Sequence, residues 1–451
     1  MHLDFLFQRL EEKGEADALV WRDQTFSYAW LSARIRTWLE RLEAEGIEPG
    51  SVVALEADFS PNAVALFLAL VERGCVLVPL TSSVAAKKAE FLEIAQVECS
   101  GSIDAEDQVS FARRDATSDH ELFGELRRRG HPGLVLFSSG STGKSKASVH
   151  DMVDLLEKFR TPRPAYRTVS FLLYDHIGGV NTMLHTLANG GTLITVADRR
   201  PESVLAAIER HKVELLPTSP TFLNMILLSE AYKGSDLSSL KLVTYGTEPM
   251  LESTLETFHR LFPEIRLAQT YGLSETGILR AKSKSSDSLW VKLGGEGFET
   301  RVVDNILHVR ARSAMLGYLN AESPVTEDGW FVTGDLVEQD GEYLRILGRK
   351  SEIINVGGEK VYPAEVESVV QELDEVAEVS VYGQRNAILG NAVCARITVR
   401  PDTDTKDLPI RVKKHCRERL ERFKVPVKVE VVDSSQHGER FKKMRPNEER
   451  A

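Results

Sequence analysis

A short apolar run that ends in serine, threonine and glycine constrains the fold of this chain more than any other feature. Residues Gly133 to Phe137 are typical of a buried strand, and the segment from Ser138 to Lys146 has the sequence Ser-Ser-Gly-Ser-Thr-Gly-Lys-Ser-Lys. This segment cannot continue the strand without exposing backbone N–H groups that lack acceptors. Its glycines allow close backbone approach, and its hydroxyls and Lys146 add donors and charge. The pattern predicts a loop that binds a polyphosphate, with a solvated surface loop as the alternative.

The loop does not have the spacing of a P-loop NTPase. That motif requires a glycine five residues before the glycine that precedes its lysine. Gly143 precedes Lys144, but position 138 is a serine. The spacing therefore excludes a P-loop ATPase.

The segment from Phe26 to Leu80 alternates between the periodicities of helices and strands. Apolar residues at helical spacing cover Tyr28 to Glu45 and Asn62 to Glu72, whereas Val52 to Leu55 and Val76 to Leu80 are apolar runs typical of strands. This alternation predicts a parallel sheet covered by helices.

Three later segments have the pattern of a strand followed by a polar turn. They are Phe171 to Leu173, Leu215 to Thr218 and Leu242 to Tyr245. Open parallel sheets place ligands at the carboxyl ends of their strands. We therefore expect the turns after these strands to line a site.

Size and charge narrow the class of protein. A chain of 451 residues is longer than one hydrophobic core usually supports, so we expect two or more domains. The net charge of -11 disfavours non-specific binding to nucleic acid or to an anionic membrane surface.

The four cysteines form no Cys-x-x-Cys pair, which favours buried thiols in a reducing cytoplasm over zinc or disulfides. The longest apolar stretch, Ala63 to Leu80, is broken by Glu72 and Arg73, so no membrane span is expected. The amino terminus lacks a basic region followed by an apolar one, so no export signal is expected.

A second polar motif lies between Gln269 and Gly277. Tyr271 offers an aromatic face to a purine, Ser274 offers a hydroxyl to a phosphate, and Glu275 offers a hard oxygen ligand to Mg²⁺. A polar turn with a solvated glutamate is the alternative. The presence of the phosphate loop favours the nucleotide interpretation.

These motifs resemble, in order and over most of the chain, those of the adenylate-forming superfamily of acyl-CoA synthetases, AMP-dependent synthetases and luciferases. The resemblance extends to Thr333-Gly334-Asp335, to Gly348-Arg349 and to the basic residues near the carboxyl end. It implies an α/β fold with a large N-terminal adenylate-forming domain, in which helices flank parallel sheets beside a β-rich subdomain, and a small mobile α+β lid. The implied boundaries are 1–348 for the N-terminal AMP-binding domain, 349–351 for a hinge with Ser351 as its pivot, and 352–451 for the C-terminal lid.

The resemblance assigns the nucleotide site residue by residue. The loop residues hold the phosphates, the turn after the strand at 242–245 faces adenine, Tyr271 stacks on it, Ser274 contacts the α-phosphate, and Asp335 and Arg349 hold the ribose. Gly357 and Gly358 leave room for a pantetheine arm on the lid. The full set is Ser139, Gly140, Ser141, Thr142, Gly143, Lys146, Gly246, Thr247, Glu248, Pro249, Tyr271, Gly272, Ser274, Asp335, Arg349, Gly357 and Gly358.

Three residues are implied to act in the chemistry. His176 moves aside to admit the acyl group, Glu275 binds Mg²⁺, and Lys442 stabilises the charge that develops as the adenylate forms. Lys443 is the alternative to Lys442, because the family's glycine before this lysine is Phe441 here.

The residues beside His176 bear on the substrate. Ile177 stands where relatives that activate amino acids carry an aspartate, and an α-ammonium without a partner would be a costly buried charge. Asp175, on the other side, would revive an amino-acid substrate if the register slipped. Gly178 and Gly179 suggest room for an acyl group.

The opening of the lid carries two acidic residues for which we expect no chemical role. Glu365 and Glu367 follow Pro363 on a predicted helix whose apolar face contains Val366 and Val370. We expect both glutamates to be solvated.

The implied activity is ATP-dependent activation of an aryl or short-to-medium acyl carboxylic acid to an acyl-adenylate, with pyrophosphate release, followed by thioester formation with CoA. The implied cofactors are ATP, Mg²⁺ and CoA, and the expected location is cytoplasmic. One alternative is loading of a carrier-protein phosphopantetheine. An alternative of another class is a non-catalytic nucleotide or acyl sensor.

Overall fold

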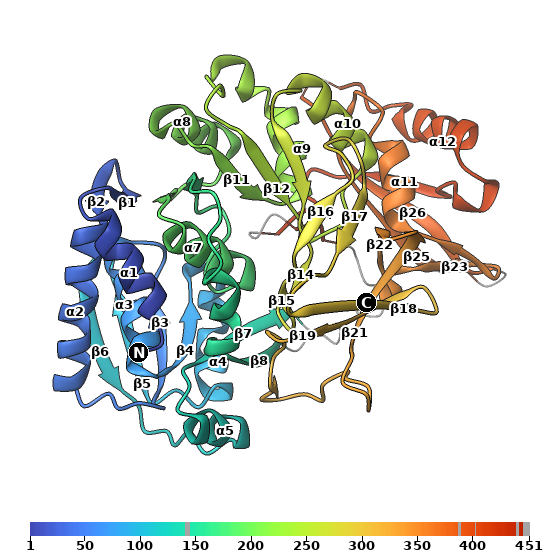
Figure 1. Ribbon diagram of the computed structural model, residues 1–451. Helices are drawn as coiled ribbons and strands as arrows, with labels where there is room; N and C mark the ends of the chain where they lie inside the picture. The colour runs from blue at the N-terminus through green and yellow to red at the C-terminus, as the bar shows by residue number, and fades with distance from the viewer. Residues whose placement is uncertain (140–144, 387–388, 402, 439–441, 445–451) are drawn as a thin grey trace.

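The computed structural model describes residues 1–139, 145–386, 389–401, 403–438 and 442–444. Figure 1 shows two α/β layers, a β-rich region beside them and a small unit at the carboxyl end. The helices of the first and largest part are α1 (Asp4–Lys13), α2 (Tyr28–Ala44), α3 (Pro61–Arg73), η1 (Ser82–Lys87), α4 (Lys88–Ile94), α5 (Glu121–Arg129), α6 (Met152–Leu156), η2 (Glu157–Phe159), α7 (Ile177–Ala188), α8 (Pro201–His211), α9 (Pro220–Ser229), η3 (Ala231–Gly234) and α10 (Glu252–Leu261).

One seven-stranded sheet carries the expected βαβ units. Its order is β20-β8-β7-β4-β3-β5-β6, with β3, β4, β5 and β7 parallel where they pair. The predicted strands and helices between positions 28 and 80 are confirmed. The strands are β3 (Val52–Glu56), β4 (Val76–Leu80), β5 (Cys99–Ile103), β6 (Val109–Arg113), β7 (Gly133–Ser139), β8 (Ser145–Asp151) and β20 (Gly317–Tyr318).

The phosphate-loop segment joins two antiparallel strands. The predicted strand at 133–137 is confirmed and runs on to Ser139, which lies opposite Ser145 on β8. Residues 140–144 and the side chain of Ser139 lie outside the part of the chain that the structure describes.

A second seven-stranded sheet has the order β13-β12-β11-β9-β10-β1-β2 and is parallel except for β2. Thr218, Tyr245 and Gln269 lie side by side at the carboxyl ends of three neighbouring strands. The strands predicted at 215–218 and 242–245 are confirmed. The members are β1 (Asp17–Trp21), β2 (Gln24–Ser27), β9 (Arg167–Val169), β10 (Thr192–Ile194), β11 (Leu215–Thr218), β12 (Leu242–Tyr245) and β13 (Arg266–Gln269).

The strand predicted at Phe171 to Leu173 is wrong. The strand there is β9, which ends at Val169, and a turn follows in which Leu173 O accepts from His176 N–H at 3.2 Å. A Cβ on Gly179 would lie 2.0 Å from Leu173 O, so the turn packs directly on the start of α7. Gly179 therefore provides room for this turn and not for an acyl group.

A six-stranded antiparallel sheet forms the β-rich region, in the order β16-β17-β22-β21-β19-β18, and the pair β14-β15 lies before it in the chain. Asp335 on β21 lies directly opposite Arg349, the last residue of β22. The strands are β14 (Gly272–Leu273), β15 (Gly277–Ile278), β16 (Ala281–Ser283), β17 (Trp290–Leu293), β18 (Phe298–Val303), β19 (Ile306–Ala311), β21 (Phe331–Asp340) and β22 (Tyr343–Arg349).

The carboxyl-terminal part has its own hydrophobic core, built from residues between Ile354 and Val431. Figure 1 shows it in orange and red beside α9 and α10. We call it the lid. Its sheet is β24-β23-β26-β25 with β27 paired to β26, and its elements are η4 (Lys350–Glu352), β23 (Ile354–Val356), β24 (Glu359–Val361), α11 (Pro363–Val370), β25 (Val376–Asn386), β26 (Gly390–Val399), α12 (Leu408–Arg419), η5 (Arg422–Lys424) and β27 (Lys428–Val431).

Among the described residues, every helix is too short or too polar to pass through a bilayer. The long apolar helix α3 is instead buried within the protein, with every residue from Pro61 to Val71 inaccessible.

Candidate active site

The site lies at the carboxyl edge of the second sheet, where β11, β12 and β13 end in register. The turn after β12 requires glycine at its first position, because a Cβ on Gly246 would lie 2.5 Å from Thr270 Oγ1. Thr247 follows with a φ of 76° and is exposed. The Gly246 to Pro249 backbone therefore opens at this edge, as predicted for a segment that faces a ligand.

Tyr271, Asp335 and Arg349 form one hydrogen-bonded group. Tyr271 Oη donates to Asp335 Oδ2 at 2.6 Å, and Arg349 Nε pairs with Asp335 Oδ1 at 2.8 Å. The register of β21 and β22 sets the second contact. These three residues were predicted to meet the nucleoside, and the structure brings them together.

Burial governs the ionisation of this group. Burial and the charge of Asp335 raise the pKa of Tyr271 well above its ordinary value, so its hydroxyl remains a donor. Burial also raises the pKa of Asp335, while the positive charges of Arg349 and Lys442 act in the opposite direction. A buried carboxylate beside a guanidinium can accept further hydroxyl donors, which suits the two hydroxyls of a ribose.

Glu275, Tyr318 and Lys146 form a second group. Tyr318 Oη donates to Glu275 Oε1 at 2.6 Å, and Lys146 Nζ lies 5.1 Å from the centre of the Tyr318 ring. Burial and the negative charge of Glu275 raise the pKa of Tyr318, so the phenol stays protonated. The contact orients a carboxylate and a lysine, both predicted for the phosphate side of the site, around one aromatic ring.

The fit of Mg²⁺ to this group can be judged from its donors. No cluster of three histidine, cysteine or acidic residues that could hold a metal occurs in the described ranges. Mg²⁺ is usually held by one or two carboxylates together with substrate phosphates and waters. Glu275 alone, with one oxygen oriented by Tyr318, fits that mode and would hold the ion only together with bound phosphates.

His150 supports the loop that carries Ser274 and Glu275. Its Nε2 donates to Ser274 O at 2.5 Å, and burial lowers the pKa of His150, which keeps the ring neutral. We assigned no role to His150 or Tyr318 from the sequence. A signal was present for His150 alone, because Lys146, Ser148 and His150 are spaced two residues apart and so share one face of β8.

His176 occupies the N-cap position of α7 and is partly buried. Asp175 beside it is buried, and its Oδ2 accepts from Thr81 Oγ1 at 2.8 Å and from Ser83 Oγ at 3.1 Å. These contacts tie Asp175 to the turn after β4. The carboxylate that could have paired with an amino-acid substrate is thus used to join two segments of the N-terminal part.

The two candidate lysines at the end of the lid have different surroundings. The positive charge of Lys442 acts against the rise that burial causes in the pKa of Asp335. Lys443 Nζ instead pairs with Glu367 Oε2 at 2.9 Å. The side chain of Lys443 is thus engaged within the lid.

The expectation that Glu367 is solvated is wrong. Its side chain is 1% exposed, and besides pairing with Lys443 it accepts from Val381 N–H at 2.9 Å through Oε1. Position 367 lies one turn after Pro363 on the face of α11 that meets β25, which helical spacing alone did not reveal. Glu365 is bound by Lys424 Nζ at 2.6 Å and is partly exposed.

The two lid glycines that were predicted to admit a pantetheine arm lie in an exposed turn. Gly357 and Gly358 are exposed in the turn between β23 and β24, with positive φ values of 62° and 96°. Of the predicted phosphate ligands, Gly140, Ser141, Thr142 and Gly143 lie outside the described residues.

The fold and the clusters at the sheet edge define the chain as an adenylate-forming enzyme. Residues 6–305 match the family model of the AMP-binding enzyme, and residues 365–442 match that of the AMP-binding enzyme C-terminal domain. The chain belongs to the AMP-binding enzyme family.

Curated relatives cover nearly the whole chain. It is 29% identical to the indoleacetate–CoA ligase of Aromatoleum aromaticum, over 92% of this chain and 91% of that protein. It is 26% identical to the 2-succinylbenzoate–CoA ligase of Bacillus subtilis, over 95% of this chain and 94% of that protein.

Solved structures share the fold. The anthranilate CoA ligase AuaEII in complex with anthranoyl-AMP superposes with a TM-score of 0.83 at 19% identity, over 98% of this chain and 95% of that chain. The Bacillus subtilis o-succinylbenzoate CoA synthetase in complex with its acyl-adenylate superposes with a TM-score of 0.76 at 22% identity, over 98% and 97% of the two chains. The agreement extends over both the large part and the lid.

Proposed function

We propose that this protein uses ATP to convert a carboxylic acid to an acyl-adenylate, releasing pyrophosphate, and then transfers the acyl group to CoA as a thioester. The observation that carries the proposal is the position of the lid. Lys443 N–H of the lid donates to Glu248 Oε2 of the large part at 2.9 Å, so the backbone of the neighbouring Lys442 lies at the turn that we expect to face adenine. An acid–CoA ligase of the AMP-forming type needs a cation at this place in its first half-reaction, because negative charge accumulates on the α-phosphate as the carboxylate attacks.

The residues divide the work by position. Asp335 and Arg349 orient the ribose, the Gly246 to Pro249 backbone and Tyr271 hold adenine, and Ser274 contacts the α-phosphate. The loop from Ser139 to Gly143 and Lys146 bind the β- and γ-phosphates. Tyr318 keeps Glu275 oriented. When bound, Mg²⁺ supplies positive charge between the phosphates, and Glu275 would hold it.

The acyl group is proposed to enter past His176, at the start of α7. Relatives named for indoleacetate and 2-succinylbenzoate support an aryl or short-to-medium acyl acid. Asp175 is engaged by Thr81 and Ser83, and the buried Ile177 is the first residue of α7. Both features disfavour an amino acid, because its ammonium would lack a partner.

The second half-reaction requires a different lid position. We propose the boundaries 1–348 and 352–451, with a hinge at 349–351 that turns about Ser351. The turn at Gly357 and Gly358 is exposed here and would face the adenylate after rotation, where its missing side chains admit a pantetheine arm. A cytoplasmic location is part of the proposal, and it is supported by four buried free cysteines among the described residues.

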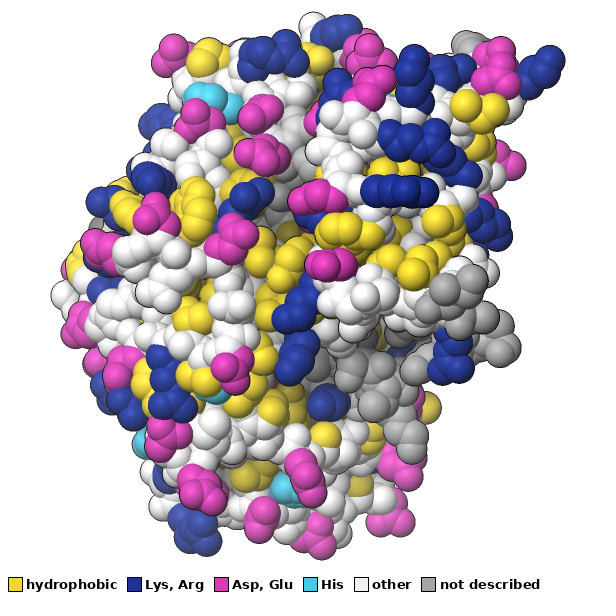
Figure 2. All heavy atoms as spheres, turned by 90° about the vertical axis from the view of Figure 1, so that its right-hand side faces the viewer, with side chains coloured by type: hydrophobic (Ala, Val, Ile, Leu, Met, Phe, Trp, Pro, Cys, Tyr) yellow, Lys and Arg dark blue, Asp and Glu magenta, His cyan; other side chains and the backbone are white. Residues whose placement is uncertain are grey.

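A carrier protein remains the rival acceptor, because its thiol also sits on pantetheine. Figure 2 shows Lys and Arg side chains gathered in the upper part of the face that contains the lid. Lys414, Arg417 and Arg422 are exposed on or after α12 and would attract either the phosphates of CoA or an acidic carrier. The relatives named as CoA ligases favour CoA.

The test is pyrophosphate release with ATP, Mg²⁺ and a panel of aryl, short and long carboxylic acids, with and without CoA. Acid-dependent release followed by acyl-CoA is the expected result. Release that yields acyl-AMP while CoA is left unconsumed would favour a carrier protein. Absence of release with every acid would overturn the proposal and favour a nucleotide or acyl sensor.

A further inference from the structure

The end of the lid forms a hairpin whose return arm carries both candidate lysines. We call residues 436–438 and 442–444 the lysine hairpin. His437 and Lys443 lie opposite each other, Gly438 N–H donates to Lys442 O at 3.0 Å, and Met444 N–H donates to Gln436 O at 2.7 Å. Successive residues of an extended arm point to opposite faces. The hairpin can therefore direct Lys442 and Lys443 to different neighbours, as their partners show.

Two glutamates, one partly exposed and one buried, hold the hairpin to the body of the lid. Glu378 on β25 accepts from Gln436 N–H at 2.6 Å and contacts His437 Nδ1 at 2.8 Å. Glu367 on α11 pairs with Lys443 Nζ at 2.9 Å. These contacts join groups within the lid, so they move with it when it rotates.

A third glutamate holds the hairpin from the other side of the domain interface. Glu248 Oε1 accepts from Thr221 N–H at 2.8 Å, in the first turn of α9, and Glu248 Oε2 accepts from Lys443 N–H at 2.9 Å. One carboxylate thus joins the large domain to the backbone of the residue next to Lys442.

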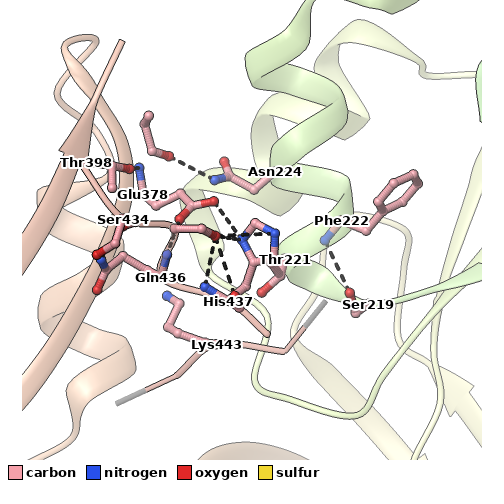
Figure 3. A network of polar contacts seen from close by, with 12 residues as sticks. Ser219, Thr221, Phe222, Asn224, Glu378, Thr398, Ser434, Gln436, His437 and Lys443 are labelled. Carbon is pink, nitrogen blue, oxygen red and sulfur yellow. Dashed lines mark hydrogen bonds and ion pairs between the residues drawn. The ribbon is translucent and has the colours of Figure 1, made fainter. Parts of the chain in front are cut away.

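A small cavity lies at the interface around this contact. Figure 3 shows Gln436, His437 and Glu378 on the lid facing Thr221 and Asn224 on α9, with Lys443 beside them. The cavity between them, lined also by Glu248, has a volume of about 30 Å³, room for one or two waters. Glu248 is partly buried at this interface.

We propose that Glu248 is a positioning residue for the adenylation half-reaction, which latches the lysine hairpin so that Lys442 reaches the α-phosphate. The inference rests on the proposed function. The side chain of Glu248 would thus act on the lid, whereas the backbone of Glu248 belongs to the segment proposed to face adenine. When the lid rotates for thioester formation, the hydrogen bond from Lys443 N–H to Glu248 is lost, whereas the contacts of Glu367 and Glu378 with the hairpin persist. Glu248 therefore favours one lid position and acts on one half-reaction.

The test compares the two half-reactions in Glu248→Gln. Glutamine has similar size but only one acceptor oxygen, so it cannot serve both N–H groups, and it lacks the charge that strengthens them. We expect acid-dependent ATP–pyrophosphate exchange at saturating ATP to fall about tenfold or more, from the loss of a charge-assisted hydrogen bond. Conversion of supplied acyl-adenylate and CoA to thioester should change less than about twofold, since the latch is open there.

Asn224→Ala is the matched control. Asn224 lies on the same helix and donates to Ala377 O of the lid at 3.1 Å, at a residue outside the hairpin. We expect it to reduce exchange less than Glu248→Gln does. Three results would overturn the latch. The first is an equal loss of exchange in the two variants, and the second is an equal loss of rate in both half-reactions of Glu248→Gln. The third is a rise in the KM for ATP without a fall in exchange at saturating ATP.

The wild type separates this inference from the proposed function. If the wild type exchanges pyrophosphate with an acid and Glu248→Gln matches it, the latch is wrong and the proposed function stands. If the wild type shows no exchange with any acid, the proposed function is wrong, and the latch falls with it.

Discussion

Replacing Lys443 should lower the stability of the lid and largely spare the adenylation rate, whereas replacing Lys442 should lower the adenylation rate and largely spare the stability. In Lys443→Met, the buried carboxylate of Glu367 loses its ion-pair partner, 2.9 Å away. Removing one partner of a buried pair typically costs about 3–5 kcal/mol. For a domain of the size of the lid, ~4–8 °C of melting temperature is lost per kcal/mol, so the lid transition should fall by at least about 12 °C. Lys442→Met should leave that transition near its wild-type position.

The chemical effect should run the other way. A unit charge about 4 Å from the α-phosphate contributes about 4 kcal/mol at an effective dielectric constant of ~20, which corresponds to about a thousandfold in rate. Lys442→Met should lose that factor in ATP–pyrophosphate exchange, whereas Lys443→Met, assayed below its melting temperature, should retain most of the exchange.

Calorimetry and exchange assays on both variants check these expectations. The double variant Lys443→Met with Glu367→Gln isolates the pair energy, because glutamine still accepts from Val381 N–H. The reasoning is refuted if Lys443→Met abolishes exchange at an unchanged melting temperature, or if Lys442→Met exchanges normally.

Three further predictions concern the rest of the site and the buried charges. Tyr318→Phe removes the hydroxyl that donates to Glu275 but keeps the ring, and should reduce kcat for adenylation about tenfold in a coupled pyrophosphate assay; an unchanged kcat would mean that Glu275 needs no orientation. Asp335→Asn leaves Arg349 without its charged partner and should raise the KM for ATP at least about tenfold in the same assay, whereas a change confined to the KM for the acid would contradict the ribose assignment. Burial lowers the pKa of Lys158 to about 7, so the unfolded chain binds more protons at this residue than the folded chain does between about pH 7 and 10. The free energy of unfolding by urea, relative to that of Lys158→Met, should therefore rise with pH across that window. A difference that does not change with pH would show that Lys158 keeps its charge in the folded protein.

The strand edges were predictable because their pattern is local. Apolar runs followed by polar turns marked β11 and β12, and the rule for open parallel sheets then placed their ends together. The run at Phe171 to Leu173 misled because apolar residues that pack a turn against a helix have the same composition as a short strand. Only the close approach of Leu173 O to Gly179 distinguishes the two.

Contacts between distant segments were not predictable from single motifs. Glu367 has the spacing of a solvated helical residue, and its partner lies far away, on the lysine hairpin. Tyr318 pairs with β8 through β20, a strand of only two residues, which is too short to show a periodicity in the sequence. Sequence motifs therefore selected Tyr271, Asp335 and Arg349, which the structure brings together, but not the side chains that orient the rest of the site.

Arg349 ends β22 and pairs with Asp335, and the proposed pivot at Ser351 follows two residues later. Two residues of chain span at most about 7 Å, so the ribose contact and the pivot are parts of one short tether. A nucleotide that binds Asp335 would compete with Arg349 for the same carboxylate. Binding would therefore weaken the contact that fixes Arg349, two residues before the proposed pivot. Release of AMP and the swing of the lid should therefore be kinetically linked, and lengthening the tether by one residue should uncouple them while leaving both half-sites intact.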